Sequence, residues 1–113
     1  MSRRWRIGAA VGALTLAATL LGTGAQALTV TPSGGPTCSM ATTKSGTYAR
    51  VSNQSCWRVQ VRVQARDSGG TVRSYTGPIS GHFSEVTSPS LMVVGYAGRG
   101  SNSSGTWSGY AAF

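Results

Sequence analysis

The sequence predicts an all-β protein, a small antiparallel sandwich or barrel of six to seven strands with one disulfide, preceded by a signal peptide. Three observations lead to this fold class. The segment Trp57–Arg66 alternates apolar and polar residues without a break, which is typical of a strand with one buried face. From Cys38 onward, Gly, Ser and Thr recur, and valines and aromatic residues come in short runs. No window in that region has a helical period.

The N-terminal residues have the three parts of a secretory signal. Three arginines lie among the first six residues, the apolar run Ile7–Leu21 follows, and Ala25-Gln26-Ala27 has the small-residue pattern of a cleavage site. The alternative is a transmembrane anchor, but a spanning helix needs about 20 apolar residues and this run is shorter. We therefore expect cleavage after Ala27, a secreted, extracellular protein, and no membrane span after cleavage.

The rest of the chain is short and basic. The whole sequence has 113 residues and a net charge of +8, and the part after Ala27 keeps seven basic and two acidic residues, a net charge of +5. This length allows one domain. Residues 28–37 contain two prolines and a Gly pair, so we expect a flexible lead-in there and a single β-sandwich domain over residues 38–113.

Cys38 and Cys56 are the only cysteines. In an exported domain two such thiols usually pair, and the loop that they close contributes about 3 kcal/mol of stability through chain entropy. A zinc site needs four ligands, and His82 is the only histidine. The sequence therefore predicts a Cys38–Cys56 disulfide, no metal site and no cofactor.

The elements before and after the long strand follow from turn residues. Cys38–Thr42 and Gly46–Val51 are expected to form a hairpin around Thr43–Gly46, with Ala49 and Val51 facing inward and Tyr48 and Arg50 outward. The long strand ends at Asp67-Ser68-Gly69-Gly70, and Thr71–Thr76 returns beside it with a bulge or an early end.

The C-terminal elements are expected to alternate between strands and loops. They comprise a short strand over His82–Val86, a turn over Thr87–Ser90, a buried strand over Leu91–Tyr96, a polar loop over Gly98–Gly105, and a last strand over Thr106–Phe113 whose Trp107 and Phe113 pack inward.

Catalytic side chains are scarce. His82 is the only histidine, and Asp67 and Glu85 are the only carboxylates. A hydrolytic triad needs a nucleophile, a base and an orienting group, and a glycosidase needs two carboxylates flanking one bond. Because Asp67 already fits a turn position, the sequence predicts a binding protein rather than an enzyme.

The polar face of the long strand is cationic. Arg58, Arg62 and Arg66 share it with two glutamines, and Arg73 on the returning strand is a further candidate. Such a surface can bind phosphates, anionic cell-envelope polymers or an acidic protein patch. The alternative is a solvated face that discourages edge pairing. We do not expect nucleic-acid binding, because the stripe lacks interleaved exposed aromatic residues.

Residues 36–98 resemble the tendamistat-type α-amylase inhibitors, small secreted bacterial proteins. The resemblance lies in Pro36-Thr37-Cys38, Asn53-Gln54-Ser55-Cys56, the alternating strand directly after the second cysteine, Gly77-Pro78-Ile79 and Gly95-Tyr96-Ala97-Gly98. It implies a six-stranded sandwich that binds an amylase active site through an exposed Trp-Arg-Tyr triplet on the first hairpin.

The chain departs from that family at two points. It has no second cysteine pair, and Ser74 lies near the place of one of the missing cysteines. The hairpin carries Thr47-Tyr48-Ala49-Arg50 instead of the triplet, so the resemblance implies a binding role for Tyr48 and Arg50. The expected function is that of an inhibitor-like binding protein with an extracellular protein target such as a glycosidase. The alternatives are a module that binds an anionic cell-envelope polymer through Arg58, Arg62 and Arg66, and a secreted antimicrobial or surface protein.

Overall fold

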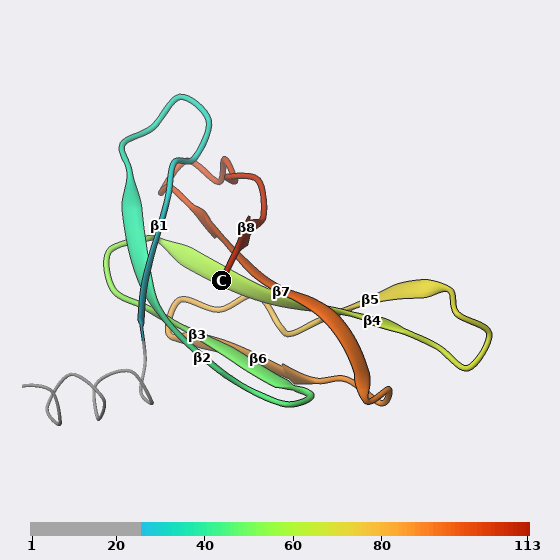
Figure 1. The fold of residues 1–113 in the computed structure, drawn as a ribbon. Coiled ribbons are helices and arrows are strands. Elements are labelled where there is room, and N and C mark those ends of the chain that lie inside the picture. Colours follow the sequence, from blue (N-terminus) through green and yellow to red (C-terminus); the bar gives the residue numbers. More distant parts are fainter. Residues whose placement is uncertain (1–25) are drawn as a thin grey trace, which may run out of the picture.

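The computed structural model describes residues 26–113, which form two four-stranded antiparallel sheets (Figure 1). Sheet A has the strand order β1-β2-β3-β6 and sheet B the order β5-β4-β7-β8. The strands are β1 (Gln26–Val30), β2 (Cys38–Ser45), β3 (Tyr48–Asn53), β4 (Arg58–Arg66), β5 (Val72–Thr76), β6 (Phe83–Thr87), β7 (Met92–Ser101) and β8 (Ala111–Ala112). The predicted all-β class is confirmed. The predicted signal sequence lies, up to Ala25, outside the described residues.

The core lies between the sheets and confirms the alternation of the long strand. Val59, Val61, Val63 and Ala65 of β4 are fully buried. From sheet A they meet the hairpin β2–β3, where Ala49 and Val51 face inward as predicted. Burying such side chains contributes roughly 1.5–3 kcal/mol for each valine. Trp57 does not continue the buried row, because it precedes β4 and is 46% exposed.

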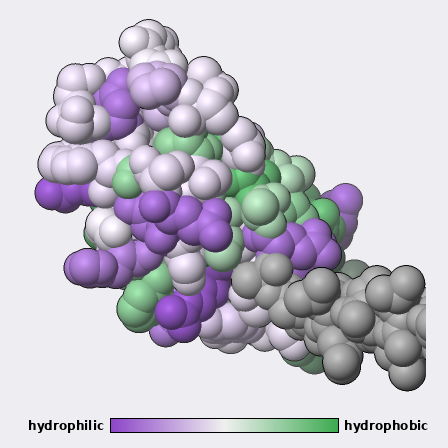
Figure 2. Space-filling view, turned by 90° about the vertical axis from the view of Figure 1, so that its left-hand side faces the viewer, coloured by the Kyte–Doolittle hydropathy of each residue, from purple (hydrophilic) through white to green (hydrophobic). Residues whose placement is uncertain are grey.

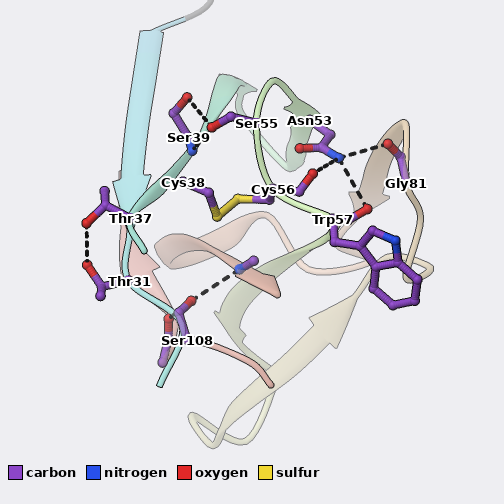
Figure 3. Close-up of a disulfide and its surroundings, with 12 residues drawn as sticks. Thr31, Thr37, Cys38, Ser39, Asn53, Ser55, Cys56, Trp57, Gly81 and Ser108 are labelled. Carbon is purple, nitrogen blue, oxygen red and sulfur yellow. Dashed lines mark hydrogen bonds between the residues drawn. A yellow bond between two sulfur atoms is a disulfide. The ribbon is translucent and has the colours of Figure 1, made fainter. Parts of the chain in front are cut away.

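The predicted disulfide between Cys38 and Cys56 is present and joins the two sheets. Cys38 is the first residue of β2 in sheet A, and Cys56 lies two residues before β4 in sheet B. Figure 3 shows the bond with the loop residues around it. The covalent link therefore fixes one end of the sandwich, where both sheets begin.

The segment expected to be a flexible lead-in is partly a strand. Leu28–Val30 belongs to β1, which pairs with β2 along its whole length, and Val30 is buried. Pairing satisfies the hydrogen-bonding groups of β2 that would otherwise lie at an edge. The loop begins only at Thr31, where Pro32, the Gly pair and Pro36 end the pairing.

The structure corrects the prediction for β7. The region from Gly98 to Ser101 was expected to be a polar loop, but it is the second half of this strand. A Cβ on Gly98 would lie 3.0 Å from Val51, and one on Gly100 would lie 2.6 Å from the Cys56 sulfur. Glycine is thus needed here for close packing of the strand on the core, not for a turn.

The first half of β7 is also not the buried strand expected over Leu91–Tyr96. Leu91 is 88% exposed, and Met92 and Val94 are exposed as well. Their end of β7 pairs with the far end of β4, near the β4–β5 hairpin that extends beyond the rest of the sandwich in Figure 1. No second layer covers the side chains there.

Smaller corrections concern the bulge, the first turn and the C-terminus. β4 and β5 pair in regular register, and the irregularity lies between Gln64 and Ala65 on the β7 side. The first hairpin turns at Gly46, since β2 extends to Ser45 and β3 starts at Tyr48. In the expected last strand only β8 is paired over more than one residue. Phe113 packs against the core as predicted.

Candidate cationic binding face

The outer face of sheet B carries four arginines. Arg58, Arg62 and Arg66 alternate with the buried valines of β4, as the sequence predicts, and Arg99 of β7 lies opposite Gln60 in the register of the two strands. Residues paired across neighbouring strands share one face of the sheet. We call these four residues and the rings that stack on them the cationic face.

Aromatic rings lie between the arginines of this face. The Arg62 guanidinium lies 4.1 Å from the centre of the Tyr110 ring, and Arg99 lies 4.4 Å from the Trp107 ring and 5.0 Å from Tyr110. Arg58 lies 4.3 Å from the ring of Trp57. The expectation that this face lacks interleaved aromatic residues is therefore wrong, and so is the inward packing expected for Trp107. The resulting prediction that nucleic acid does not bind stays a prediction without that argument.

Gln60 holds the centre of the cationic face. Its side-chain oxygen accepts hydrogen bonds from Arg99 Nε at 3.0 Å, from Arg99 Nη2 at 2.6 Å and from the Tyr110 hydroxyl at 3.1 Å. Its amide nitrogen donates to the Gly77 carbonyl at 3.0 Å. One buried amide thus fixes the arginine of β7 and the ring that stacks on Arg62, so the face is preorganised.

None of the arginines on the cationic face forms an ion pair with a carboxylate of residues 26–113. Two ion pairs occur within this part of the chain, Arg50–Glu85 at 3.9 Å and Arg73–Asp67 at 2.7 Å, and both lie elsewhere. Arg66 donates to the Gly70 carbonyl at 3.1 Å, which leaves its charge uncompensated. The positive charge of sheet B is therefore available to an external anion.

Arg73 does not join the cationic face. Its partner in the β4–β5 register is Ala65, whose side chain points to the core side. Arg73 Nε instead donates to Asp67, which also accepts from the Thr71 and Gly69 amides. The bond from Arg73 is the main reason that the pKa of the Asp67 carboxyl lies below its ordinary value, and the Thr71 amide adds to the effect.

Tyr48 and Arg50 lie on the outer face of sheet A, as predicted. Both reach Glu85 of β6, since the Tyr48 hydroxyl donates to Glu85 Oε1 at 2.8 Å and Arg50 lies 3.9 Å from the same atom. Arg50 also stacks on Phe83 at 4.1 Å. Burial, followed by the hydrogen bond to Glu85, raises the pKa of Tyr48 above its ordinary value. Sequence reasoning missed Glu85 and Phe83 because only the β3–β6 pairing brings them to this hairpin.

The two carboxylates lie in different sheets and have partners. Asp67 occupies the turn after β4, and Glu85 lies on β6 of sheet A. Over residues 26–113, no group of three His, Cys, Asp or Glu side chains is placed to hold a metal ion. Within that range there is also no helix long and apolar enough to cross a membrane.

Comparisons with protein-family models, curated proteins and solved structures give no match for this chain. The resemblance to tendamistat-type inhibitors is therefore neither supported nor opposed by a relative. The functional argument rests on the two outer faces of the sandwich.

Proposed function

We propose that this protein is a secreted, non-catalytic binding protein whose cationic face binds an anionic polymer of the cell envelope. The observation that carries the proposal is the set of four arginines on one face of sheet B, none of which has a carboxylate partner within residues 26–113. Guanidinium groups bind phosphates and carboxylates through paired hydrogen bonds.

The spacing on the cationic face favours an extended ligand. Successive arginines on β4 are four residues apart, which corresponds to about 13 Å along a strand. A small anion touches one such group, whereas a polymer with repeated charges touches several at once. Because the rings of Trp57, Trp107 and Tyr110 already hold three guanidinium groups, binding orders few side chains and its entropic cost is reduced.

The test is a titration of the purified protein with linear polyphosphate and polygalacturonate, and with dextran as the uncharged control. We expect binding to at least one of the two anionic polymers, with an affinity that falls steeply as salt rises, and no binding to dextran. Equal weak retention of all three polymers would return the arginines to the role of a solvated face.

The extracellular setting has its own test. If the N-terminal segment is a cleaved signal, intact mass of the protein recovered from the culture medium will correspond to a chain that starts at Leu28. Such a chain keeps residues 28–30 of β1. Recovery of the full sequence from cells alone would remove the cell envelope as the source of the ligand.

A second candidate function is inhibition of a glycosidase, and one observation favours it. Tyr48, Arg50 and Phe83 form a preorganised aromatic and cationic cluster on the exposed face of the first hairpin. A glycosidase cleft offers aromatic rims and catalytic carboxylates, which such a cluster complements. Its arginine must exchange Glu85 for a carboxylate of the enzyme.

Titration against several α-amylases tests this second function. We expect inhibition that is lost in Tyr48→Ala and in Arg50→Ala and retained in Arg58→Ala, whose side chain lies on the other sheet. The absence of inhibition at micromolar concentration would eliminate the amylase target and leave the polymer proposal unaffected.

A further inference from the structure

A pocket lies at the disulfide end of the sandwich, where three loops meet. These loops connect β1 to β2, β3 to β4, and β7 to β8, and they enclose about 320 Å³. This volume lies at the lower end of the range for small-molecule sites, roughly 300–1,000 Å³. We call it the loop-end pocket.

The lining of this pocket is polar but uncharged. Trp57, both half-cystines and two prolines supply the apolar surface, and hydroxyl or amide groups come from Thr37, Ser55, Ser101, Asn102 and Ser103. Figure 2 shows the same contrast on one side of the molecule, where the upper end is mostly pale and the strongly hydrophilic groups lie lower. A charged ligand therefore finds no counterion in the lining.

Ser101 gives a specific reason to expect a ligand. The residue is 1% exposed, it lies in the pocket wall, and its hydroxyl has no hydrogen-bond partner among the described residues. A buried hydroxyl without a partner costs roughly 1–3 kcal/mol. Alanine would avoid that cost at the same size, so a ligand that bonds to the hydroxyl accounts for the serine.

Trp57 is held in position at the rim. Its backbone amide donates to the Ser101 carbonyl at 2.8 Å, and the Asn53 side chain donates to the carbonyl of the neighbouring Cys56 at 2.8 Å. The close-up in Figure 3 shows Trp57 beyond the disulfide, with its ring directed away from the bond. Arg58 stacks on this ring at 4.3 Å, which restricts the ring further.

We infer that the loop-end pocket binds an uncharged pyranose sugar. A pyranose presents C–H groups to an aromatic ring and a rim of hydroxyls to hydroxyl and amide groups, and the pocket supplies both within one ring's volume. The inference goes beyond the proposed polymer binding and does not depend on it, because the charges of the cationic face contribute nothing to an uncharged ligand.

The test is an amide and indole NMR titration of the full chain with D-glucose, D-galactose, N-acetyl-D-glucosamine and maltose. Salt of 0.5 M screens the cationic face, since the Debye length is then only about 4 Å. We expect saturable shifts from at least one sugar, confined to the residues of the three loops and including the indole N–H of Trp57. No saturable shift up to 50 mM of any of the four sugars would overturn the inference.

Two pairs of variants separate binding from folding. Ser101→Ala should keep or raise the stability and weaken sugar binding about tenfold. Its control is Ser84→Ala, whose buried hydroxyl accepts from the Val61 amide and whose loss should lower stability but not sugar affinity. Trp57→Ala should lose binding, and Trp107→Phe should retain it. Unchanged affinity in Ser101→Ala, or equal effects in both members of either pair, would contradict the assignment.

Discussion

The two outer faces of the sandwich carry the same residue types and differ in how charge is compensated. On sheet A, Arg50 stacks on an aromatic ring and pairs with Glu85. On sheet B, Arg58, Arg62 and Arg99 also stack on rings but have no carboxylate partner within residues 26–113. The comparison indicates that stacking alone does not distinguish the faces. The absence of a local acid is what makes the face of sheet B a candidate for anion binding.

The largest expected effect comes from removing the bond that joins the two sheets. The double variant Cys38→Ala/Cys56→Ala should lose about 3 kcal/mol of unfolding free energy, because the loop that it opens is close in length to the 15-residue case. Urea unfolding of the variant, and of the native protein with and without dithiothreitol, measures the loss. Identical midpoints would show that the sheets hold together without the link.

A smaller loss is expected when a side chain is added between the sheets. Gly100→Ala places a Cβ 2.6 Å from the Cys56 sulfur and 3.2 Å from Val30, so it should cost about 1–3 kcal/mol by overpacking. Gly95→Ala on the same strand is the matched control, because no atom lies within 4 Å of its added Cβ. Thermal unfolding compares the two, and equal melting temperatures would refute the close-packing role of Gly100.

Removing the acid of sheet A sharpens the comparison of the faces. Glu85→Gln leaves a hydrogen-bond acceptor for Tyr48 but removes the charge, so the pKa of Tyr48 should fall toward its ordinary value. The present raised pKa stabilises the fold at pH values below the unfolded tyrosine's pKa, about 10, and that contribution is lost as pH rises through the folded pKa.

Spectrophotometric titration of native, Glu85→Gln and Tyr48→Phe proteins isolates the Tyr48 transition. The change in stability at pH 7 should stay below about 1 kcal/mol, because the Arg50–Glu85 pair is exposed to solvent. An unchanged Tyr48 transition in Glu85→Gln would mean that the carboxylate has no influence on this face.

The smallest effect concerns the hairpin tip. The lowered pKa of Asp67 means that its contribution is present above the unfolded aspartate's pKa, about 3.9, and is lost as pH falls through the lower folded pKa. Amide exchange at Thr71 should therefore speed up only at more acidic pH, and Asp67→Asn should show fast exchange already at pH 6. A transition at or above pH 4 would contradict the hydrogen bonds assigned to this carboxylate.

Local pattern was sufficient for part of this fold. The alternation in Trp57–Arg66 predicts β4 and its buried face, and the turn residues around it predict the return of β5. Ala49 and Val51 follow from the same period of two. These features depend on residues that are neighbours in the sequence.

The remaining features depend on residues far apart in the chain. Gly98 and Gly100 have the composition of a loop, and only their contacts with Val51 and Cys56 explain why they lie in a strand. Tyr110 reaches Arg62 only because the C-terminal segment crosses the outer face of sheet B. No local pattern contains that pairing, so the aromatic part of the cationic face could not be predicted.

The central claim is tested most directly by two triple variants with equal net charge. Arg58→Gln/Arg62→Gln/Arg66→Gln changes the cationic face, and Lys44→Gln/Arg50→Gln/Arg73→Gln removes three charges elsewhere. Calorimetric titration with polyphosphate at 50 mM salt should show a loss of about a hundredfold or more in affinity for the first. The second should stay within about threefold of the native protein, and both should keep the native circular dichroism spectrum. Equal losses in the two variants would contradict a binding face on sheet B, because they would mean that net charge alone determines the affinity.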